Sequence, residues 1–158
     1  YYPQVGSALY AWIFNLDVDG IGISSISGKP ILDSDEAKRR KELALDALSE
    51  MLDSKLFGAK LTRFTPFIDF EVAVAAISDK VRFTVSPPVL DLERFMLETI
   101  NRANRAREDI GNAEIEISIW CKDEAIRKVA EKVKEKAKII VTSSIRDFIV
   151  DIKRKTIH

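Results

Sequence analysis

The chain has 158 residues, enough to bury one sizeable hydrophobic core, so we expect a single domain over 1–158, with a possible sub-division into 1–110 and 111–158. Its 25 Lys and Arg residues balance 25 Asp and Glu residues, so no net charge attracts it to nucleic acid or to an anionic membrane. Its one cysteine excludes an intrachain disulfide, and with a single, terminal histidine it also excludes a Cys/His zinc site and the Ser-His-Asp and Cys-His catalytic systems.

The first third of the chain predicts two strands and a helix. Residues 7–16 carry apolar side chains on both faces, which is typical of a strand at the centre of a sheet. Turn residues then allow residues 21–26 to return as a second strand. Asp33 and Glu36 have the spacing of a helix cap, and the apolar residues that follow predict a helix over residues 34–56.

The first turns of this helix carry four consecutive positive charges, residues 38–41. Positive charge near a helix N-terminus opposes the helix dipole. The cluster therefore requires a partner, which could be Asp33, Asp35, Glu36 or an external group.

The middle of the chain predicts three strands and a second helix. Apolar residues alternate from 68 to 76 and again from 81 to 85, which indicates two paired strands at the centre of the sheet. Pro66 separates the first of them from a shorter strand at residues 60–65. Beyond two further prolines, a capping aspartate and an apolar stripe predict a helix over residues 91–108.

The last third predicts a strand, a helix and two further strands. Residues 114–120 alternate with one apolar and one polar face, as a strand with one wet face does. A narrow apolar stripe predicts a helix over residues 123–137, and residues 138–142 and 147–154 complete the chain as strands. The whole pattern predicts an α+β fold, with an antiparallel-rich sheet of about eight strands and three amphipathic helices packed mainly on one face.

Two pairs of carboxylates suggest a site for a divalent cation, because each pair is spaced two residues apart and so points to one side of an extended chain. Ordinary turn chemistry is the favoured explanation of the first pair, and the solvent face of an edge strand is the alternative explanation of the second. The candidate residues are Asp17, Asp19, Asp69 and Glu71 for the metal, with Arg63 and Lys29 near bound phosphates.

The stretches IFNLDVDG and TRFTPFIDFEVAVA resemble the palm-type domain of diguanylate and class III nucleotidyl cyclases, in which two strands carry the metal-binding aspartates. That resemblance implies a metal-dependent nucleotide-binding domain. The second stretch lacks the paired glycines of the diguanylate cyclase hairpin. The strand order is also similar to that of longin and profilin-like domains, which bind protein partners.

Two further features have a functional and a structural explanation. The arginines of residues 91–108 could contact RNA phosphates, but without net positive charge or interleaved aromatic residues a solvated helix face is the simpler explanation. Cys121 precedes a helix, where a thiol can be activated, but a lone cysteine is more often buried and inert.

These patterns favour a non-catalytic interaction or assembly module that associates with itself or with other protein subunits. The alternative is a palm-like nucleotide-binding or nucleotide-converting enzyme that uses magnesium or manganese, and RNA binding is a weaker alternative. We expect no cofactor outside the metal-dependent alternative, no nucleic acid and no membrane partner. The chain has no apolar span of 18 residues and no signal sequence, which predicts a soluble cytoplasmic protein, and scarce thermolabile residues suggest a thermophilic source.

Overall fold

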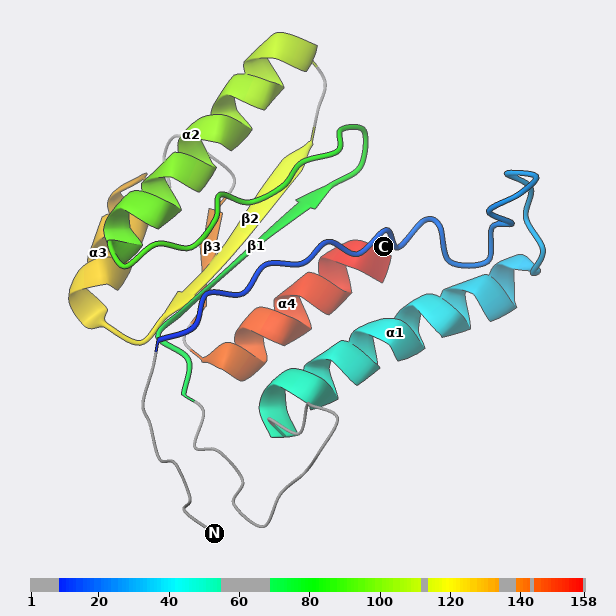
Figure 1. Cartoon of the computed structure of the whole chain (residues 1–158), viewed down its shortest axis with the longest axis horizontal. Helices are drawn as coiled ribbons and strands as arrows, with labels where there is room; N and C mark the ends of the chain where they lie inside the picture. The colour runs from blue at the N-terminus through cyan, green and yellow to red at the C-terminus, as the bar shows by residue number, and fades with distance from the viewer. Residues whose placement is uncertain (1–8, 55–68, 112–113, 134–138, 143, 158) are drawn as a thin grey trace, which may run out of the picture.

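The structure is a computed structural model that describes residues 9–54, 69–111, 114–133, 139–142 and 144–157. These residues form four helices and a three-stranded sheet (Figure 1). In chain order the elements are α1 (Ser34–Ser54), β1 (Val72–Ser78), α2 (Leu92–Ile110), β2 (Ile115–Cys121), α3 (Glu124–Val133), β3 (Ile139–Val141) and α4 (Ile145–Ile157).

The sheet has the order β1-β2-β3 and is mixed. β1 runs antiparallel to β2, with Val72 opposite Cys121 and Ser78 opposite Ile115. β3 runs parallel to β2, with Ile117 opposite Ile139. Parallel neighbours need a crossover connection, and α3 supplies it between β2 and β3.

One face of the sheet forms the hydrophobic core with α2 and α3. Ile117 and Ile119 of β2 have no exposed surface and lie in one cluster with Met96 and Ile100 of α2 and Ala130 of α3. Full burial of an isoleucine side chain stabilises a fold by about 1.5–3 kcal/mol. This face therefore supplies a large part of the driving force that orders the sheet.

The other face of the sheet packs against α4, which contacts both β1 and β2. Ser118 of β2 is buried there and donates a hydrogen bond to Asp151 of α4, while Glu116 forms an ion pair with Lys155. The prediction of a wet face for β2 is therefore wrong, because α4 covers it.

Helix α1 lies alongside α4 at the edge of the molecule (Figure 1). Among the described residues of α1, only the side chain of Leu45 is buried. An ion pair between Asp46 of α1 and Lys153 of α4 joins the two helices. The predicted cap is confirmed, because the Asp33 side chain accepts a hydrogen bond of 2.8 Å from the Glu36 amide.

Helix α2 also begins and ends as its sequence indicates. Asp91 caps it by accepting a hydrogen bond of 3.0 Å from the amide of Arg94. Gly111 ends it in a left-handed conformation with φ of 69°, and its amide donates to the carbonyl of Arg107. Glycine suits this position because it adopts positive φ without steric cost.

The predicted sheet of about eight strands with three helices on one face is wrong, although the fold is α+β. Residues 147–154 lie in the helix α4 and not in a strand. Ser144 accepts a hydrogen bond from the amide of Asp147 and donates one to its carboxylate, which is a reciprocal helix cap. Phe148 and Ile152 then recur at helical spacing on the face toward the protein interior.

Four other predicted strands have no counterpart in the described sheet. Residues 9–16 and 81–85 belong to no strand of the described sheet. Residues 21–26 lie in a sequence of turns, closed by an isolated bridge between Ile23 and Pro30. The strand predicted at residues 60–65 lies outside the described residues, and the sub-division of the domain stays a prediction.

Candidate functional site

The carboxylates of Asp69 and Glu71 lie together just before β1, where both meet one lysine. The Lys122 ammonium is 2.7 Å from the Asp69 carboxylate and 3.6 Å from that of Glu71. The Lys122 amide also donates to the backbone carbonyl of Glu71. The hydrogen bond from Lys122 to Asp69 and the charges of both acids raise the pKa of Lys122. A protein cation thus lies against both carboxylates.

The other acidic pair lies in the loop that precedes α1, at the opposite end of the molecule from the start of β1 (Figure 1). Asp17 accepts a hydrogen bond of 3.0 Å from the amide of Gly20, which is turn chemistry. Asp19 forms an ion pair of 2.8 Å with Lys41 of α1. The structure therefore brings Asp69 and Glu71 together but does not bring them to the first pair.

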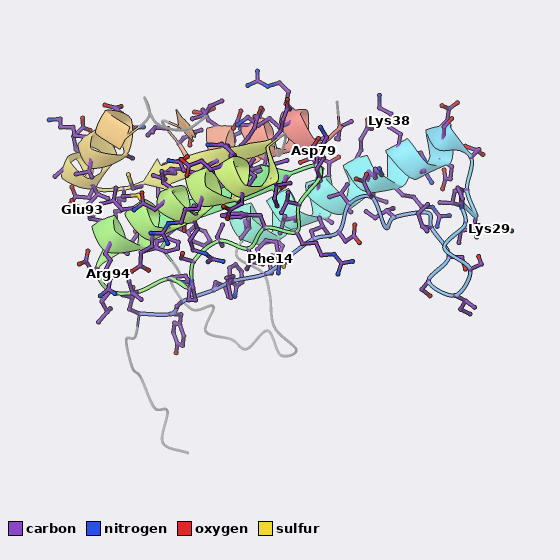
Figure 2. The ribbon with its side chains drawn as sticks, turned by 90° about the horizontal axis from the view of Figure 1, so that it is seen from above. Phe14, Lys29, Lys38, Asp79, Glu93 and Arg94 are labelled. Atoms are coloured by element: carbon purple, nitrogen blue, oxygen red, sulfur yellow. The ribbon has the colours of Figure 1, made fainter. Side chains whose placement is uncertain are left out.

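Within the part of the chain that the structure describes, no group of three or more His, Cys, Asp or Glu side chains could hold a metal ion. Lys29 is exposed in the loop before α1, and Arg63 lies outside the described residues. Figure 2 shows Lys29 at one end of the molecule. Metal and phosphate binding at these positions stay predictions.

The basic cluster of α1 is neutralised within its own first turns and by the preceding loop. The Glu36 carboxylate accepts hydrogen bonds from Arg39 at 2.8 Å and from Arg40 at 2.7 Å. These bonds lower the pKa of Glu36 to about 2. With Lys41 paired to Asp19, three of the four positive charges have partners inside the chain.

The arginines of α2 are mostly engaged in structural contacts. Arg94 pairs with Glu98 at 2.8 Å, and the guanidinium of Arg102 lies 5.7 Å from the centre of the Phe83 ring. Arg107 donates to the backbone carbonyl of Ile115, and so ties the end of α2 to the start of β2. This surface offers fewer guanidinium groups to phosphates than its sequence implies.

A buried polar cluster joins α4 to the sheet, and sequence reasoning missed it. Asp151 is 3% exposed, and its carboxylate accepts hydrogen bonds from Ser118 and Lys155, the latter at 2.8 Å. Lys155 also donates to the Ser118 hydroxyl at 3.1 Å and lies 3.3 Å from Glu116. The sequence signal for this cluster was the spacing of four residues between Asp151 and Lys155. That spacing brings two side chains together only in a helix, and these residues were predicted to form a strand.

The chemistry of this cluster is structural. Ser118 next to Lys155 has the composition of a nucleophile and its partner, yet Ser118 is only 1% exposed and no substrate can reach it. Burial alone would raise the pKa of Asp151, but the hydrogen bonds from Lys155 and Ser118 outweigh it, so that pKa is lowered. The cluster therefore holds an ionised carboxylate inside the fold.

Cys121, at the end of β2, is buried. Burial raises the pKa of its thiol above the ordinary value. A protonated, enclosed thiol is a poor nucleophile. The environment of Cys121 therefore supports the interpretation that this cysteine is buried and unreactive.

The segment Leu9–Leu16, hereafter the apolar segment, exposes large side chains to solvent. Tyr10 is 87% exposed, Leu9 63% and Phe14 53%. The Trp12 and Phe14 rings meet edge to face, with their centres 6.4 Å apart. Contiguous exposed apolar surface is typical of an interaction site, so this segment is the candidate functional surface.

None of the helices in the described ranges is long and apolar enough to cross a membrane.

Comparison with known proteins gives relatives of one kind. A protein described as CRISPR-associated protein Cas7/Csa2 1 of Saccharolobus solfataricus is 34% identical over 96 residues, which cover 61% of this chain and 29% of the relative. CRISPR-associated protein Cas7/Cst2/DevR of Methanocaldococcus jannaschii is 28% identical over 136 residues, 82% of this chain and 42% of the relative. A second S. solfataricus protein, described as CRISPR-associated aCascade subunit Cas7/Csa2 2, is 27% identical over 156 residues, 96% of this chain and 45% of the relative.

The chain thus spans less than half the length of each of these relatives. The relatives come from thermophiles, which agrees with the scarcity of thermolabile residues in this chain.

No solved structure matches the chain. Residues 1–99 match the family model described as CRISPR-associated negative auto-regulator DevR/Csa2. Because this match covers more than half of the 158 residues, the chain belongs to the CRISPR-associated DevR/Csa2 family.

Proposed function

We propose that this chain acts as a non-catalytic protein subunit of a CRISPR-associated assembly. The observation that carries the proposal is its membership of the DevR/Csa2 family. The S. solfataricus relative described as an aCascade subunit matches 96% of the chain, which supports a subunit role. The exposed apolar segment supports it independently, because such surface is costly in an isolated soluble protein.

The chemistry of the described residues agrees with a role in binding. The buried serine is inaccessible, the buried thiol has a raised pKa, and the acidic pair before β1 is paired with Lys122. Each of these groups has a structural explanation. The metal-dependent alternative stays a prediction, and the family match gives it no support.

The test of this proposal is affinity purification of the tagged protein from its own organism, followed by mass spectrometry. We expect other CRISPR-associated proteins to co-purify in fixed proportion to the tagged chain. Native mass spectrometry of the purified chain tests the self-association part. A chain that is recovered alone, and that remains a monomer at high concentration, would contradict the proposal.

RNA contact is a second candidate function, favoured by the family match. CRISPR effector complexes hold a guide RNA, and their proteins recognise it through its backbone and charge. Because the chain belongs to a CRISPR-associated family, the expectation that it has no nucleic acid partner is no longer supported. Lys29 and Lys38 are better candidates for phosphate contacts than the arginines of α2. Both lysines are exposed, have no ion pair among the described residues and lie toward one end of the molecule (Figure 2), whereas most arginines of α2 contact other groups of the chain.

Ribonuclease treatment during the same purification tests this second function. If the chain contacts RNA, a short protected fragment remains with it after digestion. Recovery of the protein subunits without any RNA fragment would contradict RNA contact and leave the protein-subunit proposal intact.

A further inference from the structure

The loop that precedes α1 contacts the first half of that helix. The Asp19 carboxylate lies 2.8 Å from the Lys41 ammonium of α1. Gly22 also lies against α1, since a Cβ atom built on this glycine would be 3.3 Å from the Cβ of Ala37. Residues 17–54, hereafter the loop–helix unit, are therefore held together by contacts of their own.

The loop–helix unit buries few side chains. α1 has 21 residues, and among the described side chains of the unit only that of Leu45 is buried. α2 has 19 residues and buries five side chains, among them Met96 and Ile100, which are at most 1% exposed. Because burial of apolar surface is the main term that holds an element in a fold, α1 is held less firmly than α2.

The unit is attached to the rest of the protein through α4, which α1 packs against at the edge of the molecule (Figure 1). The ion pair that joins the two helices has an Asp46 side chain 55% exposed and a Lys153 side chain 37% exposed. Exposed ion pairs contribute little to stability. α4 itself is anchored to the sheet by the buried hydrogen bond between Asp151 and Ser118. The weaker junction is therefore the one between α1 and α4.

We infer that the loop–helix unit opens away from α4 as one cooperative unit while α2, α3, α4 and the sheet stay folded. Proteins open locally in contiguous units, and the units with few buried apolar contacts open at the lowest cost in free energy. The exposed Lys29 and Lys38 lie in this unit, so its opening moves both lysines relative to the sheet. The inference rests on packing and does not depend on either function proposed above.

The test is hydrogen exchange of the whole chain, compared between residues 42–49 of α1 and residues 115–121 of β2. An undocked helix of this length is only marginally stable in water, so its amides exchange from the open state. After correction for intrinsic rates, we expect the amides of α1 to exchange at least about a hundredfold faster than those of β2, because they require only the partial opening.

A pair of substitutions in α1 tests the docking contact. Leu45→Ala should speed exchange in α1 by about tenfold or more, since it removes the buried side chain of the unit. Leu43→Ala is the matched control, because Leu43 lies in the same helix and is 59% exposed. We expect this control to leave exchange in α1 unchanged.

A substitution in the core separates partial opening from global unfolding. Ile119 of β2 has no exposed surface, and Ile119→Val should speed exchange in β2 by about threefold to tenfold. Exchange in α1 should stay unchanged, because the core around Ile119 remains intact when the loop–helix unit opens.

Asp46→Lys is a second variant of the docking contact, and it leaves the Leu45 side chain in place. It puts two positive charges between α1 and α4, and should speed exchange in α1 by about twofold to fivefold. Addition of Lys153→Asp restores an ion pair of opposite direction and should reverse the change.

Three outcomes would overturn the inference. The first is exchange in α1 at the rate of β2, since α1 would then open only with the whole molecule. The second is equal acceleration of α1 and β2 by Ile119→Val. The third is exchange in α1 that neither Leu45→Ala nor Asp46→Lys changes, which would mean that the helix frays in place without leaving α4.

Discussion

At the scale of single residues, the buried side chain of Asp151 fixes the orientation of α4 on the sheet. A buried carboxylate loses its hydration, and this loss is offset only where hydrogen bonds and a counter-charge replace the lost water. Ser118 and Lys155 supply both, and Arg154 adds a contact of 3.3 Å. Rotation of α4 about its axis would break the hydrogen bonds of Asp151 and Lys155 to Ser118 of β2, so these contacts to the sheet select one orientation of the helix.

The substitution Asp151→Asn should destabilise the protein by about 2–4 kcal/mol, because it leaves the Lys155 charge half-compensated in a buried site. Urea unfolding at pH 7 measures this change. The matched control is Asp46→Asn, which breaks the exposed pair with Lys153 and should cost less than about 1 kcal/mol. Equal effects of the two substitutions would mean that the cluster contributes no more than a surface ion pair.

The lowered pKa of Asp151 also predicts how stability depends on pH. A carboxyl group with a lower pKa in the folded state stabilises the fold above its unfolded-state pKa, near 3.8, and loses this contribution as pH falls through the folded-state pKa. The stability difference between the wild type and Asp151→Asn should therefore be constant from pH 7 to about pH 5 and shrink below pH 4. Urea titrations at pH 7, 5, 4 and 3 would show this, and a difference that grows on acidification would contradict it.

At the scale of elements, α4 connects parts of the chain that are distant in sequence. It contacts β1, β2 and α1, and so it covers one face of the sheet and also holds α1 against the rest of the protein. The helix forms because Ser144 and Asp147 cap its start and its basic residues, Arg154 and Lys155, lie in its last turn, where they complement the helix dipole.

Substitution of Ser144 by alanine removes the side chain that accepts a hydrogen bond from the Asp147 amide. We expect a loss of about 1 kcal/mol of stability, measured by thermal or urea unfolding. Ser144→Thr serves as a control, because threonine keeps the hydroxyl that accepts this hydrogen bond and donates to the Asp147 carboxylate, and should retain most of the stability. If alanine and threonine behaved alike, the capping interaction would not contribute to α4.

At the scale of the whole molecule, zero net charge means that any affinity for RNA depends on local groups. If Lys29 and Lys38 each contact a phosphate of single-stranded RNA, replacement of either by alanine should reduce the slope of log affinity against log salt by about 0.7. Filter binding at several salt concentrations measures the slope. The comparison variant is Arg94→Ala in α2, which we expect to change the slope little, because Arg94 already pairs with Glu98 at 2.8 Å. The reverse result would assign RNA contact to α2.

The sequence by itself determined the local features of this protein. The caps at Asp33 and Asp91, the starts of α1, α2 and α3 to within a residue and the turn chemistry of Asp17 follow from interactions between near neighbours in the chain. The sequence pattern also located β2 and β3, although distant residues pair with them. The need of the basic residues of α1 for a partner was also evident, and Glu36 supplies it three and four residues away. Such interactions recur wherever the same residues recur, so a pattern can predict them.

Only the tertiary structure decided which faces are covered. Residues 147–154 alternate in a way that fits a strand as well as a helix, and the burial of Asp151 against Ser118, 33 residues away, favours the helix. The segment Leu9–Leu16 has the pattern of a central strand, yet no strand of the described sheet contains it. Pairing of a strand depends on a partner that its own residues do not specify, so the sequence could show that this segment requires cover and could not show what covers it.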